Sequence, residues 1–255
     1  MSKFNVVGLA RNPIDKYYTS KVVVKSCMEY VNTYIDISKN DLCIEPSAGN
    51  GAFINDIKSL FSNYIFYDIE PNNSDIIKQN YLEFDYDLIN KNNYNKIHIV
   101  GNPPFGRQSS LAIKFIKKSC KYCDSISFIL PKSFKKDSMK KHFSLNFHLI
   151  YEYDLPKDSF IVNNKIYDVP CIFQIWIKQN TNRTVPKKLE PTNYRFVKRN
   201  EQPDISVRRI GVNAGNLYKD LKTKSIQSHY FIKLDIELTE DLFIKLSNIK
   251  YTSKN

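Results

Sequence analysis

Apolar residues in the first two thirds of the chain alternate between helical stripes and short continuous runs. Residues 20–35 carry apolar side chains every three to four positions, which predicts an amphipathic helix that Thr19 or Ser20 can cap. Residues 41–44 form a short apolar run that stops at Glu45-Pro46 and predicts a buried strand. The same reasoning predicts strands at 64–67, 96–100, 125–130, 150–155 and 171–177, and helices at 53–61 and 109–121.

Strands separated by helices predict a doubly wound α/β sheet. Such sheets bind ligands beyond the carboxyl ends of their strands. Glu45, Asp68 and Asn102 each follow the end of a predicted strand. We therefore expect the functional site along this edge of the sheet.

The pattern changes after Lys178. Residues 179–188 are polar and basic and read as a linker, and short strands are predicted beyond it at 194–197, 205–210 and 230–234. A final helix follows Thr239, its expected cap. The sequence thus predicts a catalytic domain at 1–180 and a small, basic, β-rich domain at 181–255.

The chain is strongly basic, with a formal net charge of +12. Between Lys178 and Lys233 there are thirteen Lys and Arg against four Asp and Glu, so most of the excess lies in this region. Such an excess favours a polyanionic partner, above all nucleic acid. Enrichment of Lys and Asn in an AT-rich genome is the alternative explanation.

The chain has five cysteines, which is an odd number. Its sequence contains no apolar run as long as that of a signal peptide or a membrane span. We expect a reduced, intracellular protein, cytoplasmic or nuclear and not secreted, that does not associate with a membrane. Cys120 and Cys123 have the spacing of half a zinc site, but no second pair completes it, so no metal is expected.

A glycine-containing loop, residues 45–53, follows the first predicted strand and opens a helix. It lacks the G-x-G-x-x-G and P-loop patterns, and an acidic residue at the strand end would repel phosphate. Glu45 would instead suit a cation, such as the amino group of a methionine moiety. Asp68, at the end of the next strand, can accept hydrogen bonds from ribose hydroxyls.

Two motifs carry a family resemblance. Residues 45–53 resemble the first motif of class I S-adenosylmethionine-dependent methyltransferases, and Asn102-Pro103-Pro104-Phe105 resembles the fourth motif of their amino-methylating, N6-adenine branch. Lys16-Tyr-Tyr-Thr19 is similar to a motif that precedes the cofactor loop, so the motif order resembles the γ arrangement. The resemblance implies a Rossmann-like methyltransferase sheet that binds S-adenosylmethionine through Tyr18, Thr19, Glu45, Ser47, Gly49, Gly51, Asp68, Asn80, Tyr81 and Asn102.

The same resemblance implies the catalytic residues Asn102, Pro103, Pro104 and Phe105. The Asn102 side chain and the Pro103 carbonyl would accept hydrogen bonds from the target amino group and stabilise the positive charge that develops on it. Phe105 would stack on the target base, which is flipped out or single-stranded. Phe160 is the candidate for a second aromatic wall, and an ordinary core position is the alternative for it.

Other reactive residues favour structural roles. Pro170-Cys171 matches the nucleophile motif of cytosine C5 methyltransferases, but Asn102 to Phe105 already fill the place that this motif takes there, so a core cysteine is expected. His98 and His142 lack obvious partners for acid–base work and are expected to be structural. The lysines between 132 and 141 form either a solvated helix face or a phosphate contact.

The substrate is the property that the sequence determines least. Relatives with this motif modify adenine in DNA, adenine or guanine in RNA, and glutamine in proteins, and the basic region favours nucleic acid. Arg208 and Arg209 are expected to bind phosphates or guanine edges, with a surface hairpin as the alternative. The γ-like order favours DNA, and the alternatives are an RNA N6-adenine methyltransferase or a non-catalytic nucleic-acid-binding subunit. A protein partner that supplies specificity also stays open, as does the oligomeric state.

Overall fold

The computed structural model describes residues 17–162, 165–186 and 190–249. Two compact units meet in the sequence between Val185 and Pro186, inside the predicted linker, and each is described by itself. In the described ranges, no helix has the length and apolar character needed to cross a membrane.

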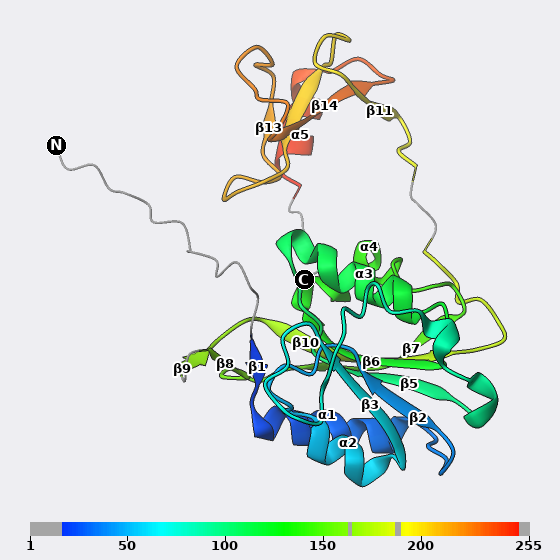
Figure 1. Cartoon of the computed structure of the whole chain (residues 1–255). Helices are drawn as coiled ribbons and strands as arrows, with labels where there is room; N and C mark the ends of the chain where they lie inside the picture. The colour runs from blue at the N-terminus through cyan, green and yellow to red at the C-terminus, as the bar shows by residue number, and fades with distance from the viewer. Residues whose placement is uncertain (1–16, 163–164, 187–189, 250–255) are drawn as a thin grey trace. The chain divides into compact units, whose positions relative to one another are not determined.

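A seven-stranded sheet forms the centre of the N-terminal unit (Figure 1). Its strands are β2 (Leu42–Glu45), β3 (Asn63–Asp68), β4 (Ile77–Lys78), β5 (Ile97–Gly101), β6 (Ser125–Pro131), β7 (Phe147–Asp154) and β10 (Cys171–Lys178), in the order β4-β3-β2-β5-β6-β10-β7. The first five strands of this order are parallel, whereas β10 runs antiparallel to both β6 and β7. The doubly wound α/β sheet expected from the sequence is therefore confirmed.

The strand order reverses between β2 and β5. From β2 the chain steps outward through β3 to β4, and it then returns to the other side of β2 to form β5 and β6. Reversal leaves a crevice at the carboxyl ends of these two strands, where open α/β sheets bind ligands. Glu45 ends β2 and Asn102 follows β5, so both lie at this crevice.

Helices cover both faces of the sheet (Figure 1). They are α1 (Lys21–Tyr34), α2 (Ile54–Leu60), α3 (Ser110–Ser119) and α4 (Asp137–Lys140), with 3-10 turns at Tyr86–Leu88, Lys91–Asn93, Arg107–Ser109 and Lys132–Lys135. Because side chains alternate along a strand, the sheet has two cores: Ile44 packs in the α3 core and Cys43 in the α1–α2 core. Ser20 holds the N-cap position of α1 but makes no side-chain cap, contrary to expectation.

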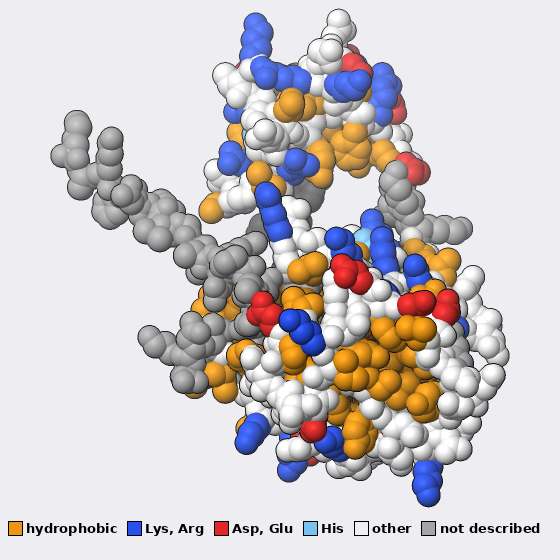
Figure 2. All heavy atoms as spheres, viewed as in Figure 1, with side chains coloured by type: hydrophobic (Ala, Val, Ile, Leu, Met, Phe, Trp, Pro, Cys, Tyr) orange, Lys and Arg blue, Asp and Glu red, His pale blue; other side chains and the backbone are white. Residues whose placement is uncertain are grey.

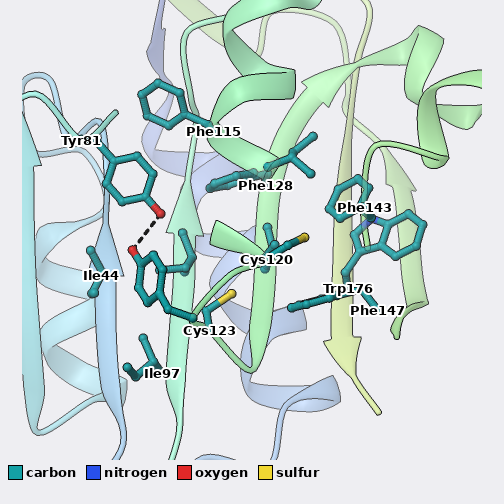
Figure 3. Close-up of a cluster of buried hydrophobic side chains, with 14 of the residues drawn as sticks. Ile44, Tyr81, Ile97, Phe115, Cys120, Cys123, Phe128, Phe143, Phe147 and Trp176 are labelled. Atoms are coloured by element: carbon teal, nitrogen blue, oxygen red, sulfur yellow. Dashed lines mark hydrogen bonds between the residues drawn. The ribbon is translucent and has the colours of Figure 1, made fainter. Parts of the chain in front are cut away.

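The core on the α3 side is rich in aromatic rings (Figure 3). Trp176 of β10 stacks on Phe143 with ring centroids 4.0 Å apart. The Tyr81 ring stacks on Phe115, and its buried hydroxyl is hydrogen-bonded to Ser119 Oγ and to the Tyr122 hydroxyl. These bonds satisfy polar groups that would otherwise destabilise the core.

A small antiparallel sheet joins β1 (Tyr18–Thr19), β8 (Phe160–Val162) and β9 (Lys165–Tyr167), in the order β1-β8-β9. Thr19 pairs with Phe160 across β1 and β8. These strands are only two or three residues long, and no pattern in the sequence predicted them. They hold the segment before α1 next to the chain that precedes β10.

The C-terminal unit is a four-stranded antiparallel sheet with one helix. Its elements are β11 (Tyr194–Val197), β12 (Ile205–Arg208), β13 (Leu217–Tyr218), β14 (His229–Leu234) and α5 (Glu240–Ser247), in the strand order β11-β14-β12-β13. Thr239 caps α5 as predicted, because its Oγ1 accepts a hydrogen bond from Leu242 N. The predicted strands are confirmed, and the two-residue β13 is added.

Candidate active site

A cavity of about 310 Å³ lies at the carboxyl ends of β2, β3 and β5. It is lined by Tyr17, Tyr18, Thr19, Glu45, Pro46, Ser47, Ala48, Gly49, Asn50, Ala52, Phe53, Asp68, Ile69, Glu70, Asn80, Tyr81, Leu82, Asn102, Pro104, Leu111 and Phe115. Polar groups of strand ends and apolar side chains of α3 thus face one space. This combination of apolar walls and a few placed polar groups is typical of small-molecule sites.

The loop between β2 and α2 depends on glycine. Gly49 and Gly51 have φ angles of +55° and +84°, in the region that residues with a Cβ seldom adopt. A Cβ on Gly49 would also lie 3.2 Å from the Tyr18 ring, so glycine lets the loop and the tyrosine approach each other. Gly51 is not among the cavity-lining residues, and a Cβ there would meet Ile54 Cδ1 at 2.7 Å. In the structure, Gly51 therefore acts as a turn residue.

Asp68 ties the end of β3 to this loop. Its Oδ2 accepts a hydrogen bond from Gly49 N and its Oδ1 accepts one from Glu70 N, both at 2.8 Å. These bonds fix the carboxylate at the cavity wall. Each carboxylate oxygen has a second lone pair, so ligand hydroxyls can still be bound.

Glu45 is a buried carboxyl without a full set of partners. Its side chain is 1% exposed, and its Oε2 has no hydrogen-bond partner among the described residues. Burial, together with the neighbouring Asp68 carboxylate, raises the pKa of Glu45 to about 8. Such a group is stabilised by a cationic ligand, which would supply both the missing donor and the missing positive charge. The cavity therefore suits a ligand with an ammonium and a ribose.

Asn102 lies directly after β5, and three contacts fix its orientation. Its side-chain Nδ2 donates to the Tyr17 carbonyl at 3.1 Å and to Thr19 Oγ1 at 3.3 Å. Its main-chain carbonyl accepts from Ser47 Oγ at 3.1 Å. Because Nδ2 makes both side-chain bonds, the amide presents Oδ1 elsewhere. Oδ1 is buried and has no partner in the described part of the chain.

The rest of the tetrad is arranged around this amide. Pro104 lines the cavity, whereas Pro103 is buried. Phe105 is half-buried and packs against both cores of the sheet, and its carbonyl accepts from Leu111 N at the start of α3. Phe105 therefore links the tetrad to α3 and is not part of the cavity wall.

Comparison with known proteins gives the same fold. A protein of Pyrococcus horikoshii assigned as an RNA methyltransferase matches with a TM-score of 0.51 at 14% identity, over 66% of this chain and 90% of its own. A protein of Listeria monocytogenes assigned as a class I S-adenosylmethionine-dependent methyltransferase matches with a TM-score of 0.51 at 13% identity, over 71% of this chain and 66% of its own. A ribosomal RNA small subunit methyltransferase A of Mycoplasma mycoides is 25% identical over 93% of this chain and 98% of its own length. No family model matches.

The chain has the fold of class I S-adenosylmethionine-dependent methyltransferases. Its similarity to a ribosomal RNA methyltransferase along nearly the whole length of both chains supports methyltransferase activity. Its cofactor is S-adenosylmethionine, as the sequence predicted. The orphaned Glu45 oxygen and the fixed Asp68 carboxylate fit that cofactor, which carries an amino group and a ribose. An N6-adenine type is consistent with these relatives.

Two of the residues expected to bind ligands in this methyltransferase have side chains that lie in the core. Phe160 is fully buried, and Tyr17 covers it edge-on with ring centroids 6.1 Å apart. No base can stack on Phe160 in this arrangement, so the core alternative holds. Tyr81 lines the cavity but directs its hydroxyl into the core, and Asn80 Oδ1 already accepts from Leu82 N.

Arg208 and Arg209 belong to the C-terminal unit of the methyltransferase. Arg208 Nε donates to the Ile210 carbonyl, and Arg209 donates twice to the Gln227 carbonyl. The Arg209 guanidinium also lies 5.3 Å from the centre of the Tyr230 ring. Both side chains are thus partly occupied by local contacts, and their role in substrate binding stays a prediction.

The lysines after β6 are neutralised locally. Lys132 and Lys135 pair with Asp154, and Lys140 pairs with Glu152. Both carboxylates stand on β7, which the sequence could not place beside the lysines. These three lysines are therefore poor candidates for the phosphate contact.

Buried positions explain the remaining reactive groups. Cys171 is 2% exposed, and burial raises the pKa of its thiol to about 12, which confirms a core cysteine. His98 is buried, with Nε2 3.1 Å from Asp41 Oδ2 and Nδ1 2.7 Å from Ser125 Oγ, so its structural role is also confirmed. Cys120 and Cys123 are buried and free, each part of the α3-side core.

Sequence reasoning missed several wall residues. Tyr17, Leu111 and Phe115 line the cavity, although the sequence assigned none of them to the site. Tyr17 stands beside Tyr18 and Thr19 in the motif before α1, so its neighbours were the available signal. Nothing local in the sequence marks Leu111.

Proposed function

We propose that this methyltransferase transfers a methyl group from S-adenosylmethionine to the exocyclic N6 amino group of adenine in RNA. One observation carries the proposal: Asn102 presents a buried acceptor, Oδ1, that no described residue satisfies, on an amide that Thr19 and Tyr17 hold in place. A buried acceptor without a donor is costly, so it indicates a donor supplied by the substrate. A planar amino group is such a donor.

The chemistry needs orientation more than acid–base catalysis. The nitrogen lone pair of an adenine amino group is delocalised into the ring, and acceptors on its hydrogens favour the geometry in which the lone pair faces the methyl donor. Asn102 Oδ1 and the Pro103 carbonyl would be those acceptors. They also stabilise the positive charge that forms on the nitrogen, because they are fixed before the reaction.

When bound, S-adenosylmethionine supplies a methyl group activated by an adjacent sulfonium. Asn102 Oδ1 and the Pro103 carbonyl would hold N6 toward that methyl group, and N6, once methylated, would release a proton to water. Within the chain, Asp68 would hold the ribose hydroxyls and Glu45 would pair with the amino group. Tyr18, Ser47 and Gly49 complete the part of the cavity assigned to the cofactor.

An exposed tyrosine replaces Phe160 as the proposed second wall for the target base. Tyr167 of β9 pairs with Phe160 of β8, is 39% exposed, and has its ring centroid 5.6 Å from that of Tyr17. Tyr17 in turn lines the cavity. The target base can stack on the Tyr167 ring without disturbing the core.

We favour RNA as the substrate, although the order of the motifs in the sequence favoured DNA. The relatives that match along nearly their whole length, from Mycoplasma mycoides and Mycoplasma capricolum, are both ribosomal RNA small subunit methyltransferases. This likeness favours the RNA alternative, and with it an intracellular site of action. No observation favours a non-catalytic role.

The decisive experiment supplies purified protein and S-adenosylmethionine with a labelled methyl group to small-subunit ribosomal RNA, double-stranded DNA, single-stranded DNA and total protein. Nucleosides are then analysed by mass spectrometry. We expect N6-methylated adenosine from RNA, and none with Asn102→Ala, which should keep its cofactor affinity in calorimetry. Label confined to DNA, to protein or to 5-methylcytosine would overturn the proposal, and absence of cofactor binding would support the non-catalytic alternative.

A further inference from the structure

A groove of about 610 Å³ lies in the C-terminal unit, where β11 ends and β14 begins. It is lined by Phe196, Val197, Lys198, Arg199, Asn200, Ile226, His229, Tyr230 and Phe231. None of these residues was singled out in the sequence. The groove is formed entirely within this unit, so it can be described without reference to the catalytic cavity.

Two exposed aromatic rings stand side by side in the groove. Phe196 is 55% exposed and Tyr230 is 47% exposed, and their centroids are 5.4 Å apart. They project from neighbouring strands, β11 and β14. Large aromatic side chains exposed in this way lose hydrophobic stabilisation unless a ligand covers them. The two ring planes are inclined by 57°, so each ring offers its own face on which a planar group can stack.

The surroundings of the two rings are cationic. Lys198 and Arg199 line the groove, and no side-chain ion pair with a carboxylate is found for either of them among the described residues. Arg199 Nη2 donates to the Lys222 carbonyl, and the Glu201 carboxylate accepts from the main-chain nitrogen of Lys198. The Arg209 guanidinium lies over the Tyr230 ring. Elsewhere in the same unit, Arg195, Lys219, Lys233 and Lys245 are paired with carboxylates. Figure 2 shows hydrophobic and basic side chains next to one another on the visible face of this unit.

A buried histidine supplies an independent sign of a ligand. His229 lines the groove and is 6% exposed, and its Nδ1 contacts the Ser225 carbonyl at 3.2 Å. Nδ1 also lies 2.9 Å from Ser228 Oγ, a hydroxyl that can donate or accept, so Nε2 is an acceptor in one tautomer and a donor in the other. Nε2 is buried and lacks a hydrogen-bond partner among the residues that the structure describes. A polar group of a ligand would satisfy it in either tautomer.

From these observations we propose that the groove binds unpaired nucleotides of the RNA substrate. Bases stack on Phe196 and Tyr230, a polar group on the edge of a base forms a hydrogen bond with His229 Nε2, and phosphates bind at Lys198 and Arg199. Bases inside a duplex cannot reach a side-chain platform, so the site selects single-stranded segments. The proposal rests on the proposed function, because it names the part of the chain that holds the same substrate outside the catalytic cavity.

A binding experiment without methyl transfer tests the groove. The full chain is titrated into a fluorescently labelled, unstructured RNA oligonucleotide, and anisotropy is followed at several salt concentrations. We expect Phe196→Ala and Tyr230→Ala each to weaken binding by about tenfold, and Tyr230→Phe to bind as the wild type does. Lys198→Ala should reduce the salt dependence, whereas Lys245→Ala, in an ion pair on α5, should not.

Controls keep the outcomes distinct. Val212→Ala removes a fully exposed apolar side chain outside the groove and should leave RNA affinity unchanged. Thermal unfolding of each variant excludes loss of the fold, which is not expected for exposed positions. Wild-type affinity in both Phe196→Ala and Tyr230→Ala would overturn the groove proposal and leave the proposed function intact. A change of oligomeric state in these variants at unchanged RNA affinity would also overturn it, and would indicate an interface between copies.

Failure of the proposed function gives a different result. If the wild type binds and methylates single-stranded DNA and not RNA, the proposed substrate is wrong. The same variants titrated with that DNA then decide whether the groove is a nucleic-acid site. If a labelled peptide bound the wild type but not Tyr230→Ala, and RNA did not bind at all, both the groove proposal and the proposed function would be overturned.

Discussion

Thr19 Oγ1 accepts a hydrogen bond from Asn102 Nδ2 at 3.3 Å and thereby orients the side-chain amide that we propose as the catalytic group. The two residues are 83 positions apart in the sequence, and β1, paired with β8, brings Thr19 to the end of β5. Because this bond uses the amide nitrogen, the amide oxygen is left for the substrate. Thr19 thus acts through Asn102 as a positioning residue.

Replacing Thr19 with Val should lower kcat about tenfold, the equivalent of one lost hydrogen bond of about 1.4 kcal/mol. The shape of the side chain is kept, so the cofactor affinity measured by calorimetry should change little. Thr19→Ser retains the acceptor and should restore kcat. Equal loss of kcat in the Ser and Val variants would mean that the methyl group, and not the hydroxyl, is what matters.

Glu45 should make the free enzyme less stable as the pH rises. Its pKa of about 8 in the folded protein exceeds the ordinary 4.5, so the folded state retains a proton that the unfolded state releases between these values. Stability therefore falls between about pH 5 and about pH 8, by an amount on the order of 4 kcal/mol for this carboxyl, and levels off above.

The variant Glu45→Gln removes that titration. We expect its melting temperature to exceed that of the wild type by a margin that grows up to about pH 8, while its affinity for S-adenosylmethionine falls. Glu29→Gln, on the exposed face of α1, should show no such margin. A margin that is the same at about pH 5 and about pH 8 would contradict a raised pKa at Glu45.

Much of this site follows from the sequence because it depends on strand ends. The alternation of strands and helices placed Glu45, Asp68 and Asn102 at one sheet edge. Gly49 and Gly51 looked alike in sequence, yet only Gly49 lines the cavity. The distinction depends on which atoms surround each glycine, Tyr18 or Ile54, and spacing alone does not reveal that.

Residues whose neighbours come from distant segments were not predictable. Phe160 sits in a three-residue strand that pairs with β1, and no local pattern says which face of so short a strand is buried. The lysines after β6 looked like a basic patch because their carboxylate partners arrive on β7. The groove in the C-terminal unit likewise requires β11 and β14 to be adjacent, which strand prediction alone does not provide.

Tyr167 provides a test of the corrected second wall. Tyr167→Ala should raise KM for RNA about tenfold, because one base–ring stack is lost, with little effect on cofactor affinity. Tyr167→Phe keeps the ring and should behave as the wild type. Phe160→Leu is the contrasting variant: it should lower the melting temperature through imperfect core packing and leave KM for RNA nearly unchanged. A rise in KM for Phe160→Leu alone would restore the original assignment.

Arg183, which the sequence placed in a linker, has a definite structural role. Its guanidinium donates to the carbonyls of Lys140, Phe143, Ser144 and Phe147, and lies 5.4 Å from the centre of the Trp176 ring. One guanidinium thus binds four carbonyls around the turn between α4 and β7, of which those of Lys140 and Ser144 also accept a main-chain hydrogen bond. A planar group with five N–H donors can satisfy several carbonyls at once, which an ammonium cannot do in the same geometry.

We therefore expect Arg183→Ala to reduce the free energy of unfolding of the N-terminal unit by about 2 kcal/mol, and Arg183→Lys to recover only a small part of it. Trp176 is the one tryptophan of the chain, so its fluorescence during urea denaturation reports this unit selectively. Lys58→Ala removes an exposed ion pair with Asp75 in the same unit and should shift the urea midpoint much less than Arg183→Ala does. If Arg183→Ala and Lys58→Ala unfolded at the same urea concentration, the contacts of Arg183 with the carbonyls would stabilise the unit no more than a surface ion pair does.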